Sequence, residues 1–219
     1  MNSPLIVEYY SDVLCVWAWI AQRRIDELNH TFGDKIEFKH HYVDIFGDVP
    51  TKMDTSWKSK GGYEGFAKHV QHSAASFDDA IINEKIWTSI RPTTSANAHL
   101  YLKAIEKTYG EKMAQDMSLY IRQHFFRDGF DISNLQVLDA LANQHELSLQ
   151  DIHTNINDGS AMALLMSDYQ QAKALSIKGS PSYVIDGGRQ TLYGNVGYRV
   201  LHANIEEILK HPENEASWC

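Results

Sequence analysis

The chain has 219 residues, of which 43% are hydrophobic, so it is long enough to bury one large core or two small ones. No stretch approaches the roughly 18 consecutive apolar residues that a membrane span needs, which argues against a membrane protein. The net charge of −8 argues against a nucleic-acid partner, because phosphate binding needs a clustered basic face.

The cysteines, Cys15 and Cys219, lie near opposite ends of the sequence and make no disulfide framework. Such sparse use of cysteine fits a reducing compartment. The first residues also lack the basic start and the apolar core of a secretory signal. We therefore expect a cytoplasmic protein.

The N-terminal part has the pattern of a β-α-β unit. Residues 5–10 form a nearly all-apolar, β-branched stretch, which predicts a buried strand. After a polar break, apolar residues recur every three or four positions from about residue 15 to residue 32, which predicts a helix. Residues 36–43 alternate and predict a second strand, parallel to the first and joined to it by a right-handed crossover. One face of that strand is expected to carry Ile36, Phe38, His40 and Tyr42.

The middle of the chain predicts a loop followed by a block of helices. Residues 44–62 are rich in Gly, Asp, Lys and Ser and predict the loop, whereas nearly all of residues 63–177 is expected to be helical. Ser133 has the Ser-x-x-Gln form of a capping box and is the predicted N-cap of one helix. Apolar stripes, including Met and aromatic residues, predict the positions that face the core. These positions are Ala98, Tyr101, Leu102, Ile105, Tyr109, Met113, Met117, Tyr120, Ile121, Leu135, Leu138, Ala142, Met162, Leu165, Met166 and Tyr169.

The C-terminal part returns to strands. Residues 183–186 and 190–193 flank a Gly-Gly-Arg turn and predict a hairpin, and residues 198–209 predict a final amphipathic helix. The whole order is β-α-β, a helical block, then β-β-α, which predicts an α/β fold. We expect one domain, made of residues 1–62 and 176–219, into which an all-helical domain of residues 63–175 is inserted.

Cys15 is the sharpest candidate for chemistry because it lies where a strand ends and a helix begins. Free backbone N–H groups and the helix dipole at that point favour a thiolate, so we expect a lowered pKa for this thiol. A thiolate is the nucleophilic form of cysteine. The alternative is that Cys15 is a small hydrophobic residue of the core.

Pro181 is the second candidate, because it follows a predicted helix and comes just before a predicted strand. A peptide bond that precedes proline can be cis, and a cis bond marks a tight, specified backbone. Proline before a strand is also an ordinary boundary signal.

These two segments together resemble DsbA-like thioredoxin-fold proteins, especially the FrnE-type cytoplasmic branch. The Ser-Asp-x-x-Cys sequence at residues 11–15 resembles the C-x-x-C region of that family, and residues 177–185 resemble its cis-proline loop. The helical block, with its turn at residues 131–133, is similar to the family's inserted helical domain. The resemblance implies a thioredoxin-like fold, with the cis-Pro181 loop facing Cys15 and a substrate groove between the two domains.

The chain departs from that family at Ala18, which stands where the second cysteine is expected. A dithiol oxidoreductase needs a resolving thiol to release the mixed disulfide of the first cysteine. Cys15 and Ala18 therefore cannot cycle as a dithiol/disulfide pair. Cys219 is a conceivable resolving thiol, although an incidental surface thiol is the simpler interpretation.

Three functions remain open. In the first, Cys15 acts as a monothiol on a protein or small-molecule disulfide, and glutathione or another small thiol resolves the mixed disulfide. The second is suggested by a resemblance to kappa-class glutathione transferases and 2-hydroxychromene-2-carboxylate isomerases, which implies glutathione contacts at Ser180 and Asn195, although Val196 replaces the usual acidic residue. In the third, the chain is a non-catalytic binding or chaperone-like module.

The remaining site predictions concern the surroundings of Cys15. Asp12 is expected to cap the helix or to tune the thiol, and Trp17 to line the groove beside Ala18. Ser180, Pro181 and Ser182 would shape the backbone of the groove. We expect no tightly bound cofactor and no metal site, since the histidine pairs have no cysteine near them in sequence. A homodimer is an open alternative.

Overall fold

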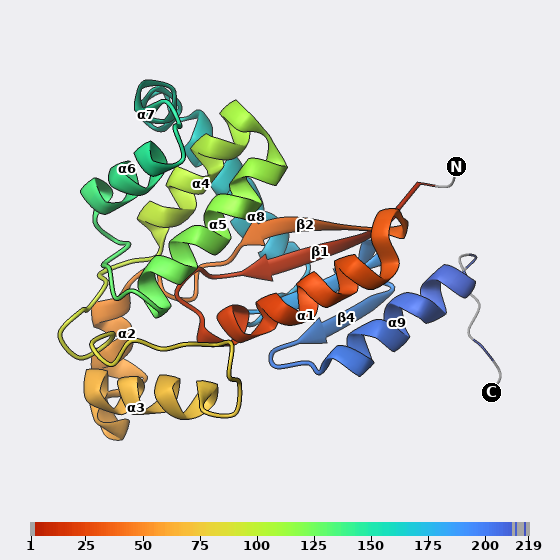
Figure 1. The fold of residues 1–219 in the computed structure, drawn as a ribbon, viewed down its shortest axis with the longest axis horizontal. Helices are drawn as coiled ribbons and strands as arrows, with labels where there is room; N and C mark the ends of the chain where they lie inside the picture. Colours follow the sequence, from red (N-terminus) through yellow and green to blue (C-terminus); the bar gives the residue numbers. More distant parts are fainter. Residues whose placement is uncertain (1–2, 212, 214–216, 218–219) are drawn as a thin grey trace.

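The computed structural model describes residues 3–211, 213 and 217, and its centre is a four-stranded sheet in the order β2-β1-β3-β4 (Figure 1). The parallel pairing of β1 with β2 confirms the predicted β-α-β unit, and Tyr9 lies opposite His40 in its register. The hairpin of β3 and β4 is also confirmed, and β3 pairs antiparallel with β1. The strands are β1 Leu5–Ser11, β2 Ile36–Tyr42, β3 Ser182–Ile185 and β4 Gln190–Tyr193.

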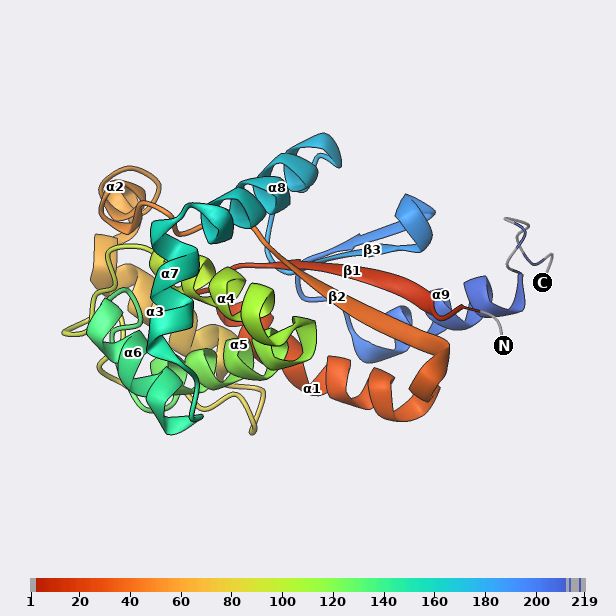
Figure 2. The same ribbon diagram turned by 90° about the horizontal axis from the view of Figure 1, so that it is seen from above.

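Helices cover both faces of this sheet. Figure 2 shows α1 and α9 on one side and α8 on the other. Tyr9, Phe38 and Tyr183 point from three strands into an apolar cluster with residues of α1 and α9. The helices are α1 Val16–Phe32, α2 Val49–Thr55, α3 Gly62–Ala74, α4 Ala96–Tyr109, α5 Glu111–Phe126, α6 Leu135–Gln144, α7 Leu149–Asn157, α8 Ser160–Ala174 and α9 Tyr198–Lys210. No helix among the described residues is long and apolar enough to cross a membrane.

The loop predicted over residues 44–62 is partly wrong, because it contains α2 and the start of α3. The side chain of Asp48 accepts a hydrogen bond from the Thr51 N–H, and a proline follows in the first turn. Both are signals of a helix start. The polar composition of the segment concealed this short helix.

The predicted continuous helical block is also interrupted, since residues 75–95 contain no helix. This segment is held by its main chain to neighbouring helices. The Asn83 N–H donates to the Phe126 carbonyl at 2.6 Å, and the Trp19 Nε1–H donates to the Ile81 carbonyl at 3.3 Å. Tertiary contacts therefore replace the hydrogen bonds that a helix would have supplied.

The predicted capping box at Ser133 is wrong by one residue. The N-cap of α6 is Asn134, whose side chain accepts from the Gln136 N–H at 2.9 Å. Ser133 instead accepts from the Thr93 N–H at 3.1 Å and donates to Asp131 at 2.6 Å. The shift turns Leu135 outward, and it is 51% exposed rather than part of the core.

Most of the predicted core stripes are buried, but Met162, Met166 and Tyr109 are exposed. The buried positions of α8 are Ala161, Leu165, Asp168 and Ala172, one narrow line along the helix. The opposite face of α8 therefore meets solvent, although its first half carries the apolar residues Met162, Leu164 and Met166. Composition alone did not separate the two faces of this helix.

The helical block packs directly on the start of α1. Leu14, Trp19 and Tyr42 belong to the same large apolar cluster as Phe126 and Leu165. The rings of Trp19 and Phe126 stack with their centroids 5.8 Å apart. The domain boundaries at residues 62/63 and 175/176 remain a prediction.

A chain of ion pairs joins the sheet to α4 and α8. His41 on β2 lies between Glu8 and Asp168, with its Nδ1 3.0 Å from Asp168 Oδ1. Lys103 on α4 lies 2.9 Å from Asp168 Oδ2 and 2.7 Å from Glu106. Burial alone would lower the pKa of His41, but the two carboxylates outweigh it and hold that pKa above 6.5.

The His41→Gln variant should therefore lose stability in a pH-dependent way. The His41 charge contributes stability that is full below the ordinary pKa of 6.5 and is lost as pH rises through the higher folded pKa. We expect the variant to lose roughly 1–3 kcal/mol of unfolding free energy at about pH 6. Urea unfolding from about pH 6 to about pH 9 should show this deficit shrinking with rising pH.

The matched control is His30→Gln, an exposed residue of α1. It should lose little stability and show no such trend. A deficit in His41→Gln that stays constant over the same pH range would contradict the assignment of a charged His41.

Candidate active site

Cys15 lies at the N-cap of α1, just after the end of β1. Its N–H donates to the Asp12 carbonyl at 3.1 Å, and its carbonyl accepts from the Ala18 and Trp19 N–H groups, each at 3.1 Å. These bonds fold the chain from the strand into the first turn of the helix. The side chain of Cys15 is 6% exposed.

The thiol of Cys15 faces the loop of Ser180 and Pro181, as the resemblance implies. The Cys15 Sγ–H donates to the Ser180 carbonyl at 3.1 Å, and the peptide bond between Ser180 and Pro181 is cis. The loop is also tied to the other chain segment by the Asp12 N–H, which donates to Ser180 Oγ at 2.9 Å. Two segments about 165 residues apart in sequence therefore meet at one sulfur atom.

The predicted fall in the pKa of Cys15 is wrong. Burial raises this pKa, and hydrogen bonds that the thiolate would accept from the Ser180 side chain and from the Ala18 backbone only partly oppose it. The nearby Asp12 carboxylate raises the pKa further. The thiol is thus protonated at neutral pH, as its hydrogen bond to a carbonyl requires.

Asp12 does not cap α1. Its carboxylate is fully buried and accepts hydrogen bonds from Leu14 N–H at 2.9 Å, Phe46 N–H at 2.9 Å and Ser95 Oγ at 2.8 Å. The Ile45 N–H is a fourth donor, at 3.2 Å. The carboxylate therefore fastens the loop before Cys15 to the loop after β2 and to the start of α4.

His99 supports the same loop and was not predicted. It is fully buried, and its Nε2 accepts from the Val13 N–H at 3.2 Å, so the ring proton lies on Nδ1, 3.3 Å from the Tyr169 hydroxyl. Burial lowers the pKa of His99 and keeps the ring neutral. Tyr42 stacks on it with ring centroids 4.6 Å apart. No local pattern links His99 to residue 13, which lies 86 residues away.

The other predicted residues surround the thiol in different ways. Ala18 is fully buried, and Trp17 is half-buried against the large apolar cluster. Ser182 is buried, and its hydroxyl donates to the Gly179 carbonyl at 2.8 Å, inside the proline loop. Cys219 lies outside the described residues.

A cavity of about 360 Å³ runs along the proline loop and is lined by Lys178, Gly179, Ser180, Tyr193 and Gly194. The Gly194 N–H donates to the Pro181 carbonyl at 2.8 Å, which holds the 193–195 turn against the loop. Asn195 is exposed next to this turn and does not line the cavity. Of the two residues proposed for glutathione, Ser180 alone reaches the cavity.

Within the described residues, no three His, Cys, Asp or Glu side chains converge in a way that could hold a metal ion. The chemical groups around Cys15 are a thiol, a buried carboxylate and main-chain amides. This arrangement allows an extended substrate that carries a disulfide or a thiol to lie along the main chain of the proline loop, next to the Cys15 sulfur.

Comparison with known proteins places this geometry in context. Residues 6–206 match the profile of the DSBA-like thioredoxin domain. The fold is similar to a probable DsbA oxidoreductase from Streptomyces coelicolor, with 17% identity, a TM-score of 0.71 and coverage of 94% of this chain and 91% of that one. No curated protein matches the sequence.

Two further structures share the fold. The cytosolic disulfide reductase DsbM from Pseudomonas aeruginosa, solved with GSH, is 15% identical with a TM-score of 0.67, and the match covers 96% of this chain and all (100%) of that one. A 2-hydroxychromene-2-carboxylate isomerase is 10% identical with a TM-score of 0.65, over 97% of this chain and 100% of the other.

We expect Asp12→Asn to destabilise the protein by roughly 3 kcal/mol, because an amide group would turn a donor toward buried N–H groups that need an acceptor. Urea unfolding measures the loss. The control is Asp116→Asn, an exposed position on α5 that should change stability little. Equal stability of Asp12→Asn and the wild type would contradict the anchoring role of the carboxylate.

The raised pKa of Cys15 predicts slow alkylation at neutral pH. In a Cys219→Ala protein, which keeps Cys15 as its single thiol, the iodoacetamide rate should keep rising with pH past the ordinary thiol pKa. The same protein in urea provides the reference for an ordinary thiol. If the rate instead reaches its plateau at a lower pH than in the unfolded protein, the fold stabilises the thiolate.

Proposed function

We infer that this chain, which belongs to the DSBA-like thioredoxin domain family, exchanges thiols and disulfides through one cysteine, Cys15. The observation that carries the proposal is the 3.1 Å hydrogen bond from the Cys15 thiol to the Ser180 carbonyl beside cis-Pro181. It supports a substrate sulfur bound against the proline loop and within reach of Cys15. We also propose that the protein is cytoplasmic and belongs to the FrnE-type branch of this family.

The reaction needs the Cys15 proton to leave first, since the thiolate is the nucleophile. The thiolate then attacks one sulfur of a disulfide substrate. A bond forms between Cys15 Sγ and that sulfur, the substrate S–S bond breaks, and its electron pair leaves on the second sulfur, which takes up a proton.

Ala18 makes the next step intermolecular. A dithiol protein would release the mixed disulfide with its own second cysteine, but alanine has no nucleophile. A small thiol of the glutathione class would attack the substrate sulfur of the mixed disulfide, form a new disulfide with it and return Cys15 as a thiol. The cavity beside Ser180 could hold such a thiol, without any tightly bound cofactor.

The buried state of Cys15 favours a second candidate, a thioredoxin-fold binding module without turnover. A protonated sulfur with 6% exposure is a poor nucleophile until the groove opens or a substrate displaces its cover. In this case the cavity along the proline loop would bind its ligand and release it unchanged. The glutathione-dependent isomerase or transferase alternative has less support, since Asn195 does not line the cavity beside Ser180.

A disulfide-exchange assay with a fluorescent glutathione disulfide and excess glutathione tests the monothiol mechanism. The wild type should accelerate exchange, and Cys15→Ala should fall to the uncatalysed rate while keeping its fold. Ala18→Cys should create a C-x-x-C pair, because position 18 lies one helical turn from Cys15. This variant should also catalyse the reduction of a protein disulfide by dithiothreitol.

The control for the added activity is the double variant Cys15→Ala with Ala18→Cys, which should be inactive. Mass spectrometry of the wild type after the assay should find a glutathione adduct on residue 15. Full activity in Cys15→Ala would rule out the mechanism, and a wild type that binds glutathione without exchange or adduct would establish the binding module.

A further inference from the structure

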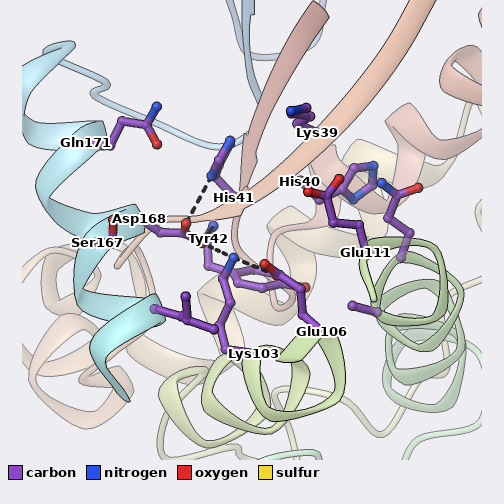
Figure 3. A pocket seen from close by; sticks show the side chains of 13 residues that line it. Lys39, His40, His41, Tyr42, Lys103, Glu106, Glu111, Ser167, Asp168 and Gln171 are labelled. Atoms are coloured by element: carbon purple, nitrogen blue, oxygen red, sulfur yellow. Dashed lines mark hydrogen bonds and ion pairs between the residues drawn. The ribbon is translucent and has the colours of Figure 1, made fainter. Parts of the chain in front are cut away.

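A second cavity, of about 140 Å³, lies at the outer edge of β2 and shares no lining residue with the cavity beside Ser180. Figure 3 shows it between β2, α4, α5 and α8. Thirteen residues line it, and the polar ones that matter below are Lys39, His40, Glu106, Glu111 and Gln115. A cavity of this size suits a small molecule rather than a nucleotide or a long peptide.

The floor of this cavity is the unpaired edge of a strand. β2 is the outermost strand on that side of the sheet. The Val43 N–H bonds toward β1, at the Ser11 carbonyl, whereas the Tyr42 N–H points the other way, to Asp168 Oδ2 at 2.9 Å. Alternation along the strand therefore turns the main-chain groups of residues 38, 40 and 42 outward.

Side chains from two helices cover two main-chain groups of this edge. Asp168 of α8 accepts from the Tyr42 N–H, and Gln115 of α5 donates to the Phe38 carbonyl at 2.9 Å. Between them, the N–H and the carbonyl of His40 face the cavity. A further strand cannot pair there, because the side chains take the places of its main-chain groups, but a ligand one residue long fits between them.

The strongest charges around the cavity are already neutralised. His41 and Lys103 lie against Asp168, with Glu8 and Glu106 as their second partners. By contrast, Lys39 and Glu111 form no ion pair with any described residue. Figure 3 shows Lys39 at the top of the cavity and Glu111 and Glu106 below it. The free charges are thus of opposite sign, with Lys39 on β2 and Glu111 at the start of α5.

His40 adds a neutral polar group to the wall. Its Nδ1 is buried and has no hydrogen-bond partner among the described residues. Burial, with Arg122, His41 and Lys103 nearby, lowers the pKa of His40 to about 3, so the ring carries no charge at physiological pH. The ring therefore adds no charge to the site.

We propose that this cavity binds a small zwitterion of the free amino-acid class. The ammonium group lies toward Glu111, the carboxylate lies toward Lys39, and the main chain of His40 hydrogen-bonds the ligand between them. A simple anion would meet the unpaired Glu111, and a simple cation would meet Lys39, so each is disfavoured at one end. The site uses neither Cys15 nor the proline loop and is independent of thiol exchange.

Calorimetric titration of the full chain with L-alanine tests this site, with propionate and ethylamine as probes that each lack one charged group. Alanine should bind, and the two single-charge probes should bind at least about tenfold more weakly. In a ¹H–¹⁵N NMR spectrum, the His40 amide should be among the signals that alanine shifts most. The Cys15→Ala protein should bind alanine equally well.

Lys39→Gln and Glu111→Gln should each weaken alanine binding at least about tenfold while leaving the thermal midpoint unchanged. The matched controls are Lys35→Gln and Glu27→Gln, two exposed positions away from the cavity, which should bind as the wild type does. Absence of binding at about 10 mM alanine would overturn the proposal, because a specific site for this ligand should be occupied at that concentration. The proposal is equally overturned by propionate or ethylamine binding as tightly as alanine, or by unchanged binding in both cavity variants.

Discussion

The buried carboxylate of Asp12 is the interaction on which the candidate active site depends. A charge that is fully removed from water is tolerated only when its oxygens are hydrogen-bonded, and here the donors come from three segments: Leu14, the loop at Ile45 and Phe46, and Ser95. The backbone N–H of the same residue holds Ser180. One residue therefore fixes the end of β1, the loop after β2 and the start of α4 in a single geometry, and Cys15 follows three residues later.

The protonation state of Cys15 depends on two opposing effects on its pKa, and their sizes decide which one dominates. The dipole at a helix N-terminus favours a negative charge by roughly 0.3–1 kcal/mol, which is less than one pKa unit. Full burial can shift a pKa by as much as 3–5 units in the opposite direction. Burial dominates at Cys15, and Asp12 adds to it, so the resting thiol is protonated. Thiol exchange on this framework requires a step that brings water or substrate to the sulfur.

The same sheet carries a second polar region on its other flank. His41 and Lys103 connect β2 to α4 and α8 through Asp168, so the helical block is attached to the sheet by charges as well as by apolar packing. Gln115 covers the Phe38 carbonyl and Asp168 covers the Tyr42 N–H at the exposed edge of β2. The main chain of His40, between these two covered groups, is the floor of the proposed amino-acid site.

Local patterns in the sequence were sufficient for β1, α1, β2, the hairpin and α9, because strand and helix periodicities are properties of neighbouring residues. They also located Cys15 and Pro181, and the resemblance built on them led to the family. The sequence did not reveal the short helix α2, the true cap at Asn134 or the exposed face of α8, since each depends on which neighbour competes for a hydrogen bond or covers a side. Only the tertiary structure decided the pKa direction of Cys15, the partners of Asp12 and the role of His99, because burial and contacts between residues 33 to 168 positions apart leave no trace in a local pattern.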